Sequence, residues 1–259
     1  MISDFVAGRG LALQPSDSES RRFRFGVSRL LVPVDEEATD EDIAVIVHGS
    51  PSELVIVRAD EGRTRLFRAL QAINGAECLH ADTLVYYEWC LDQSLNYVPS
   101  VSDVAVTQCT SFDVIADVLR ESFKDYRNHY AANPRLRGSF TVTAYGEWAA
   151  SLMQDGMTRT FVAREATKGI VNGFVLVSVN EVRQLAEVVL NAVHPDAQRS
   201  GVYSMLMRSA AMYCAQLGSV KRIYISTQAE NKAVISAWQK LGLKPYLTLN
   251  TFHVMRRLA

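Results

Sequence analysis

The sequence lacks the features that mark several large classes of protein. It has no run of about eighteen apolar residues, the length that a helix needs to cross a bilayer, so no membrane partner is expected. The N-terminal residues include Asp4 and no apolar stretch of signal-peptide length, and we expect a cytoplasmic protein. The four cysteines lie far apart without a Cys-x-x-Cys pair, so we expect neither a disulfide framework nor a bound metal.

A large excess of charge of one sign is also missing. The formal net charge is −1 over 259 residues, and the lysines and arginines are scattered, which argues against nucleic acid as a partner. With 48% hydrophobic residues the chain can bury one or two ordinary cores. These properties fit an enzyme with a small-molecule substrate and indicate nothing more specific.

The most informative segment lies between residues 187 and 206. An apolar strand ends near Val193, a short polar loop follows, and an apolar helix begins at Gly201. Successive backbone N–H groups that lead into a helix N-terminus can bind the pyrophosphate of a nucleotide-type cofactor. Gly201 lacks a Cβ and lets the backbone approach a phosphate, while Arg199 adds a positive charge. A strand–helix turn without a ligand is the alternative.

The loop Gln198-Arg199-Ser200-Gly201-Val202-Tyr203 resembles the acyl-CoA-binding motif of the GNAT superfamily of N-acyltransferases, Gln/Arg-x-x-Gly-x-Gly/Ala. Tyr203 departs from that motif, because a small residue is usual there. The resemblance implies acetyl-CoA or another acyl-CoA as co-substrate, and a strand whose residues from Leu190 onward offer a backbone N–H to the thioester oxygen. The implied cofactor contacts are Asn191, Ala192, Val193, Gln198, Arg199, Ser200, Gly201, Val202, Tyr203, Gln228, Asn231 and Trp238.

The segments after the loop extend the resemblance. Residues 222–227 are expected to form a buried parallel strand, and residues 231–243 a helix with a glycine stop. In the superfamily an Asn at the place of Asn231 commonly contacts the cofactor, and a Tyr seven residues later often protonates the departing thiolate. Trp238 stands at that later position, and its indole N–H can donate a hydrogen bond but cannot supply a proton.

A narrower resemblance concerns the acceptor. The set Thr227-Gln228, Asn231, Trp238 and Thr251-Phe252-His253 is similar to that of GNAT enzymes that acylate amino groups on nucleotide-linked deoxysugars. Dense aromatic and polar residues between 123 and 148 suit a sugar and a nucleobase. The implied acceptor contacts are His129, Tyr130, Asn133, Tyr145 and Trp148. Tyr126, Tyr130 and Trp148 could equally be core residues of two short helices.

Two residues are candidates for chemistry. Period-two alternation places Glu187, Val189, Asn191 and Val193 on one face of their strand, and a glutamate at the place of Glu187 is a general base in the histone-acetylating branch of the superfamily. The alternative for Glu187 is a carboxylate facing solvent. His253 is an acceptor contact or a core histidine. A sugar amine is less basic than lysine, so proximity alone could suffice.

The sequence is expected to divide into two parts. Residues 1–100 resemble a partial GNAT-like α/β domain, with extended segments at 23–34, 43–47 and 54–58, a helix at 63–73 and a long strand at 78–91. Residues 94–103 are the expected linker, and residues 101–259 form the GNAT N-acyltransferase domain, with a strand at 104–108 and a helix at 111–119. The expected fold class is α/β (α+β), with a mixed central sheet flanked by helices.

The expected function is transfer of a short acyl group from acyl-CoA to the amine of a nucleotide-linked amino-deoxysugar, by direct attack in a ternary complex. Three alternatives remain: acylation of a protein or small-molecule amine, a non-catalytic acyl-CoA sensor or structural subunit, and a plain interaction domain. The sequence does not determine the acyl chain, the sugar, the nucleotide or the ring position of the amine. It is compatible with a homodimer.

Overall fold

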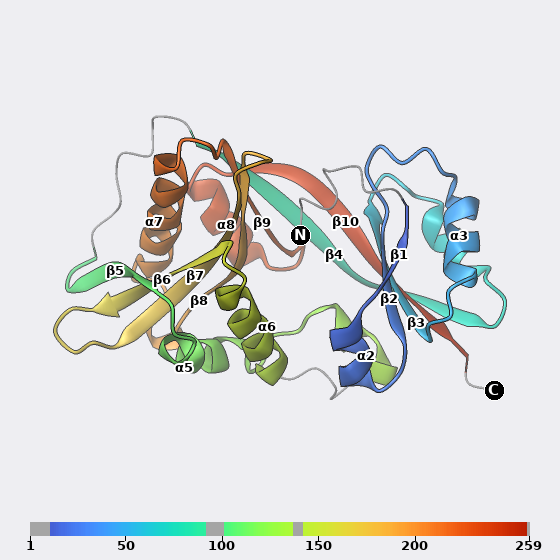
Figure 1. Cartoon of the computed structure of the whole chain (residues 1–259), viewed down its shortest axis with the longest axis horizontal. Coiled ribbons are helices and arrows are strands. Elements are labelled where there is room, and N and C mark those ends of the chain that lie inside the picture. Colours follow the sequence, from blue (N-terminus) through green and yellow to red (C-terminus); the bar gives the residue numbers. More distant parts are fainter. Residues whose placement is uncertain (1–10, 92–100, 137–141, 258–259) are drawn as a thin grey trace.

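The computed structural model describes residues 11–91, 101–136 and 142–257, which form one ten-stranded sheet. The strand order is β1-β2-β3-β10-β4-β9-β8-β7-β6-β5 (Figure 1). The two longest strands, β4 (Ala76–Cys90) and β10 (Lys244–Arg256), run side by side through the middle of this sheet. The expected mixed sheet flanked by helices is therefore confirmed.

The first part of the chain builds one end of the sheet. Its elements are β1 (Leu13–Pro15), α2 (Asp17–Phe23), β2 (Val27–Leu31), α3 (Asp40–His48), β3 (Leu54–Asp60) and α4 (Leu66–Gln71), followed by β4. Strands β2 and β3 are parallel. The predicted strand at 54–58 and the predicted helix at 63–73 correspond to β3 and α4, and the long predicted strand corresponds to β4.

The predicted strand at 43–47 is wrong, because these residues lie in helix α3. Thr39 and Asp42 form a capping box: Thr39 Oγ1 accepts a hydrogen bond from the Asp42 amide at 3.1 Å, and the Asp42 carboxylate accepts one from the Thr39 amide at 3.0 Å. Ile43 and Val47 then pack on one side against the sheet. The run of β-branched residues suggested a strand. The capping box and the four-residue spacing of Ile43 and Val47 stabilise a helix instead.

The rest of the chain builds the other end. Its strands are β5 (Val104–Cys109), β6 (Thr158–Glu165), β7 (Val171–Asn180), β8 (Leu185–Val193) and β9 (Arg222–Gln228). Its helices are α5 (Asp113–Phe123), η2 (His129–Ala132), η3 (Pro134–Leu136), α6 (Val142–Gln154), η4 (Pro195–Ala197), α7 (Val202–Gln216) and α8 (Lys232–Lys240). The predicted linker at 94–103 lies largely outside the described residues.

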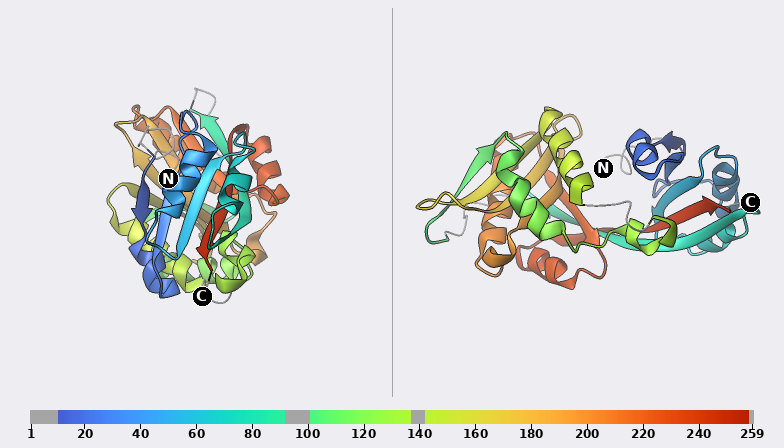
Figure 2. Two further views of the ribbon diagram at one scale, coloured as in Figure 1. Left: turned by 90° about the vertical axis from the view of Figure 1, so that its right-hand side faces the viewer. Right: turned by 90° about the horizontal axis from the view of Figure 1, so that it is seen from below.

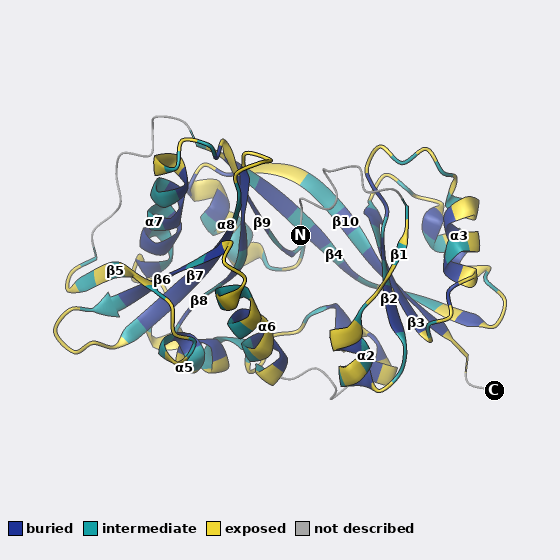
Figure 3. Ribbon diagram, in the orientation of Figure 1, coloured by how far each residue is buried: buried dark blue, intermediate teal, exposed yellow. Residues whose placement is uncertain are grey.

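The two parts exchange strands. β4, from the first part, pairs with β9, and β10, from the end of the chain, pairs with β3. The sheet is thus continuous across both parts, and the division near residue 100 remains a prediction. Figure 3 shows that buried residues follow the central strands from one end of the molecule to the other.

Helices cover both faces of the sheet. Helices α7 and α8 pack against one face at the β8–β9 end, and α3 and α4 pack against the same face at the β3 end; we call this the back face. Helices α5 and α6 cover the opposite, front face, where α2 also packs through Phe23. Figure 2 shows α6 and α2 on the same side of the sheet. The middle of the front face, over β4 and β10, therefore lies between helices from the two parts.

Candidate active site

The parallel strands β8 and β9 separate along their length. They pair from Leu185 and Arg222 as far as Val188 and Ile225, and in the described part of the chain no pair joins them beyond that point. β8 continues to Val193, held on its other edge by β7, and β9 continues to Gln228. The backbone groups of β8 that point toward β9 are thereby left accessible between the two strands, where a thioester carbonyl could be bound.

A β-bulge at Val189 changes the faces of β8. Leu176 of β7 pairs with Leu190, whereas the next residue, Val177, pairs with Val188. Glu187 therefore lies on the front face together with Leu190, and Asn191 lies on the back face. The prediction that Glu187 and Asn191 share a face is wrong, because period-two alternation fails where one extra residue is inserted. Glu187 is 7% exposed, so it is not the solvent-facing carboxylate of the alternative reading.

The loop between β8 and α7 has the backbone of an anion site. Gly201 has a φ of 90° and Arg199 a φ of 63°, which bend the chain into the helix. Ser200 Oγ donates to the Ala197 carbonyl at 2.6 Å, and Gln198 Nε2 donates to the Val193 carbonyl at 3.4 Å. No described side chain caps the N-terminus of α7. The first amides of this helix can therefore bind a pyrophosphate, and these residues fit the acyl-CoA expected here.

The two departures from the expected motif contact each other. Trp238 Nε1 donates a hydrogen bond of 2.7 Å to the hydroxyl of Tyr203. Trp238 is 1% exposed and packs against Tyr87, with ring centroids 5.4 Å apart. Burial raises the pKa of Tyr203, so its hydroxyl stays protonated and is a weaker acid than that of a free tyrosine. The single N–H of Trp238 is already bonded within the core, and a contact of its side chain with the cofactor stays a prediction.

Asn231 and Gln228 have separate roles at the end of β9. Asn231 caps α8: its Oδ1 accepts from the Val234 amide at 3.4 Å, and its Nδ2 donates to Thr227 Oγ1 at 3.1 Å. Gln228 pairs with Leu84 of β4 and so lies on the front face, where its Oε1 accepts a hydrogen bond from the Tyr126 hydroxyl. The side chain of Gln228 thus lies on the acceptor side, away from the pyrophosphate loop.

The five predicted acceptor residues form two separate groups. Tyr145 and Trp148 lie on α6, where Tyr145 is 9% and Trp148 44% exposed, and Tyr145 packs against Tyr126 with ring centroids 5.9 Å apart. His129, Tyr130 and Asn133 lie instead at η2, beside the C-terminal half of β10. The hydroxyl of Tyr145 accepts a hydrogen bond from Asn128 Nδ2 at 3.1 Å. Of these five residues, only Trp148 is exposed enough for stacking against a ligand.

The second group is a buried polar cluster. His129 Nδ1 lies 2.8 Å from His253 Nε2, and Asn133 Nδ2 lies 3.4 Å from His253 Nδ1. His253 is 0% exposed; burial lowers its pKa to about 4 and lowers that of His129 well below the ordinary value. Both imidazoles are therefore neutral at pH 7. Because both nitrogens of His253 face protein atoms, the structure favours the core-histidine reading over a catalytic one.

Tyr130 is a core anchor as well. Its hydroxyl donates to Glu19 and accepts from Arg29 Nη2 at 3.1 Å, and Glu19 and Arg29 form a two-bond ion pair at 2.7 Å. Burial raises the pKa of Glu19, but its hydrogen bonds and the charge of Arg29 outweigh burial and hold the pKa below its usual value. This cluster joins α2, β2 and η2, and no local pattern of residues predicted it.

Comparison with known proteins addresses the fold. Residues 118–243 match the model of the acetyltransferase (GNAT) family. The match covers slightly less than half of the chain, and the structure has the fold of this family. No curated protein matches the chain.

Solved structures resemble the chain over both of its parts. A tandem GNAT protein from the clavulanic acid biosynthesis pathway is 16% identical, with a TM-score of 0.60 over 90% of this chain and 76% of that one. A GCN5-related N-acetyltransferase from Sphaerobacter thermophilus is 13% identical, with a TM-score of 0.63 over 95% and 77%. Another from Kribbella flavida is 10% identical, with a TM-score of 0.55 over 90% and 82%. These likenesses concern the fold.

The sequence analysis missed one polar group that faces the GNAT domain from β4. Asp82 is 8% exposed, and it pairs across the strands with Thr251 of β10, which is 0% exposed. Neither carboxylate oxygen of Asp82 has a hydrogen-bond partner among the described residues, and neither has Thr251 Oγ1. Burial raises the pKa of Asp82. Strand β4 carries three acidic residues, Glu77, Asp82 and Glu88, and no local pattern of the sequence distinguishes Asp82 from the other two.

Two further findings concern the described residues as a whole. They contain no group of three or more His, Cys, Asp or Glu side chains placed to hold a metal ion. No helix among them is both long enough and apolar enough to span a membrane.

Proposed function

We propose that the protein transfers a short acyl group from acyl-CoA to the primary amine of a polar small molecule, with nucleotide-linked amino-deoxysugars as the acceptor class. The observation that carries this proposal is the separation of β8 from β9 immediately before a loop that leads into the uncapped N-terminus of α7. A thioester and a pyrophosphate need these two features, in this order.

The chemistry follows from the strand geometry. A thioester carbonyl placed beside Leu190 to Val193 can accept a hydrogen bond from the β8 backbone, which polarises it and stabilises the tetrahedral oxyanion. The amine must reach the carbonyl carbon in its neutral form. It would approach from the front face, because the pyrophosphate loop and α7 occupy the back face. Both substrates are then bound together, and attack is direct.

The choice of acceptor class rests on fewer residues than the choice of reaction. Gln228 and Tyr126 lie together on the front face, and Trp148 offers an exposed aromatic ring on α6. A sugar hydroxyl and a nucleobase suit such polar and stacking groups. Of the motif residues that suggested an amino sugar, Trp238 and His253 are buried by protein contacts. The amino-sugar proposal therefore depends on Gln228 and its neighbours.

The test is release of free CoA thiol from acetyl-CoA with a panel of dTDP- and UDP-linked amino sugars, with polyamines and a lysine peptide in parallel. Turnover with one sugar nucleotide supports the proposal. Turnover confined to polyamines or the peptide would replace the acceptor class, and acyl-CoA binding without turnover, after longer acyl donors are tried, would indicate a sensor or structural subunit. Failure to bind any acyl-CoA would refute the proposal entirely.

A further inference from the structure

Asp82 lies at the acceptor end of the GNAT domain, although it belongs to the first part of the chain. Gln228, the last residue of β9, pairs with Leu84 of β4. Asp82 is two residues further along β4, about 7 Å beyond that pair, and its side chain lies on the same front face as Gln228. The carboxylate is therefore just past the open end of the β8–β9 pair, where the acceptor must approach.

The side chain is buried without the hydrogen bonds that normally accompany burial. Among the described residues, both carboxylate oxygens of Asp82, Thr251 Oγ1 and Arg58 Nε are shielded from solvent and form no hydrogen bond of good geometry, although Thr251 and Gln228 lie close enough to lower the pKa of Asp82. A buried polar group left unpaired costs about 1–3 kcal/mol, and more when it is charged. Such a group in a folded protein requires an explanation, and a ligand that carries donors is one.

The local backbone also singles out this residue. Thr251 of β10 pairs with Asp82, but the next residue, Phe252, pairs with His80, so Ala81 forms a β-bulge beside Asp82. Bulges are common beside active sites, where they redirect a neighbouring side chain. Without this bulge, strand alternation would place Asp82 on the back face, among the core residues under α3 and α4.

Asp82 lies close to the aromatic residues of the acceptor side. Burial raises the pKa of Tyr126 and of Tyr145, and the charge of Asp82 adds to the rise in both. The charges of Arg58 on β3 and of His80, which lies on the back face beyond the bulge, both lower the pKa of Asp82, but burial outweighs them. Arg58 forms no ion pair with Asp82 among the described residues, so the carboxylate remains able to pair with a ligand cation.

Glu187 is a weaker candidate for the same role. It lies on β8 opposite Tyr224, inside the stretch where β8 and β9 are still paired. The thioester would lie beyond that stretch, beside Leu190 to Val193. Asp82 thus lies beside the stretch where β8 and β9 have separated, whereas Glu187 lies where these two strands are still paired.

We propose that Asp82 binds the ammonium group of the acceptor and accepts its proton, with Thr251 and Gln228 as further hydrogen-bond partners. This inference rests on the proposed N-acyltransferase function and names its base. One N–H bond breaks, and its proton passes to the carboxylate. The neutral amine forms the C–N bond to the thioester carbon, and the tetrahedral intermediate collapses with cleavage of the C–S bond. The leaving thiolate takes a second proton from the nitrogen, and Asp82 later releases its proton to water.

The test compares Asp82→Asn with wild type on the amine that the panel identifies. We expect kcat/KM to fall about 100-fold or more, the typical contribution of a general base, with the Kd for acetyl-CoA unchanged. Wild-type kcat/KM should fall at low pH as the carboxylate is protonated. In the variant that ionisation should be absent, and the rate should rise about tenfold per pH unit up to the amine pKa, because only the free amine reacts.

Two matched variants and a binding arm make the result decisive. Asp60→Asn, on strand β3, which β10 separates from β4, lies outside the site and should retain wild-type kinetics, and Glu187→Gln should retain the low-pH ionisation. If kcat/KM of Asp82→Asn stays within twofold of the wild-type value at every pH, the inference is overturned while the proposed function remains intact. If wild type acylates no amine, calorimetric titration of the same amines in the presence of CoA replaces turnover. The inference would then be overturned if the amines bind Asp82→Asn as tightly as wild type. It would also be overturned if no amine binds to wild type.

Discussion

The two parts of the chain use the same arrangement of elements with different results. In the first part, β2 leads through a loop to α3 on the back face, then to β3, α4 and β4; in the second, β8 leads to α7, β9, α8 and β10. Each series contains a parallel strand pair, and each receives a strand of the other, since β10 lies between β3 and β4 and β4 lies between β9 and β10. Only the second parallel pair opens.

The first pair stays closed along its whole length. All five residues of β2 pair with β3, and the Val32 amide continues the ladder by donating to the Arg58 carbonyl at 2.9 Å. β8 and β9, in contrast, separate after four pairs of residues. A closed ladder has no free backbone N–H between its strands, so the first pair cannot polarise a thioester.

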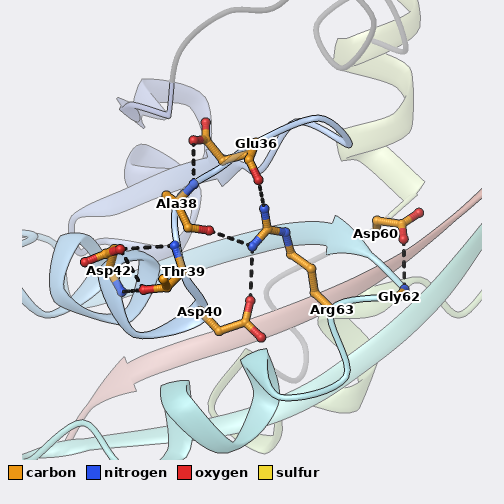
Figure 4. A network of polar contacts seen from close by, with 8 residues as sticks. All are labelled: Glu36, Ala38, Thr39, Asp40, Asp42, Asp60, Gly62 and Arg63. Carbon is orange, nitrogen blue, oxygen red and sulfur yellow. Dashed lines mark hydrogen bonds and ion pairs between the residues drawn. The ribbon is translucent and has the colours of Figure 1, made fainter.

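The loops that follow the two pairs differ as strongly. The loop before α3 contains Asp35, Glu36 and Glu37, and Arg63 fills it by donating to the Ala38 carbonyl at 3.0 Å, to Asp40 at 3.1 Å and to the Glu36 carbonyl (Figure 4). The Thr39–Asp42 capping box occupies the helix N-terminus (Figure 4). The first turn of α7, whose residues are all described, carries no acidic side chain. Of the two corresponding loops, both described, only the one before α7 is open to an anion, because a cation and a cap already occupy the other.

The largest expected effect is on acetyl-CoA affinity and comes from blocking the loop between β8 and α7. Gly201→Asp places a side chain and a negative charge beside the pyrophosphate, at a backbone φ of 90° that disfavours any side chain. We expect the Kd for acetyl-CoA, measured by calorimetry, to rise about 100-fold or more.

Gly218→Asp is the matched control, because Gly218 follows α7 at its other end and has a φ of 70°. It introduces the same charge and a similar backbone strain away from the loop, and acetyl-CoA affinity should stay at the wild-type level. Equal losses of affinity in the two variants would mean that stability, rather than the loop, explains the effect.

Acid should destabilise the part of the sheet where the two series meet. The folded protein holds His253 at a pKa of about 4, below the ordinary 6.5, so the unfolded chain binds this proton more readily. The stabilisation from neutral His253 is complete above about pH 6.5 and is lost progressively as pH falls toward 4. Chemical denaturation at several pH values should show this loss, amounting to a few kcal/mol.

His253→Gln removes the titrating group, and the comparison with wild type isolates its contribution. The variant should lose less stability than wild type between pH 6.5 and 4, although His129 still titrates beside it. An unchanged slope would show that the His129–His253 pair does not control the acid sensitivity.

Removing the Arg63 side chain from the loop before α3 should lower the free energy of unfolding without creating a second cofactor site. Arg63→Ala leaves the Ala38 and Glu36 carbonyls without their donor, and we expect a loss of about 1–3 kcal/mol in the free energy of unfolding. Acetyl-CoA should bind with a stoichiometry of one per chain in both wild type and variant, because the acidic loop and the closed strand pair remain. A stoichiometry of two in either protein would contradict the comparison.

The smallest effect is expected where the second series departs from the family motif. Tyr203→Phe leaves the Trp238 N–H buried without its acceptor and should lower the free energy of unfolding by about 1 kcal/mol. Because burial keeps the hydroxyl protonated and it bonds to Trp238, kcat should change less than twofold. A large loss of kcat with unchanged stability would assign a catalytic role to Tyr203 after all.

Local sequence patterns were sufficient to predict those elements whose formation depends on residues close together in the chain. The glycine before α7, the long strand β4 and the amphipathic helix α5 were predicted within a few residues, since spacing and turn chemistry act over short distances. The same signals misplaced α3, where a run of β-branched residues suggested a strand. Its capping box depends on residues 39 and 42, which lie outside that run.

The sequence by itself indicated the GNAT fold and raised the expectation of a pyrophosphate loop and an acyl-CoA substrate, because these depend on a contiguous motif. Only the tertiary structure decided which polar residues meet. The bulge at Val189 separated Glu187 from Asn191, and the exchange of β4 and β10 buried His253 against His129, 124 residues away. The same exchange placed Asp82 beside the open cleft. Strand order and register arise from packing over the whole sheet, and no local period of the sequence encodes them.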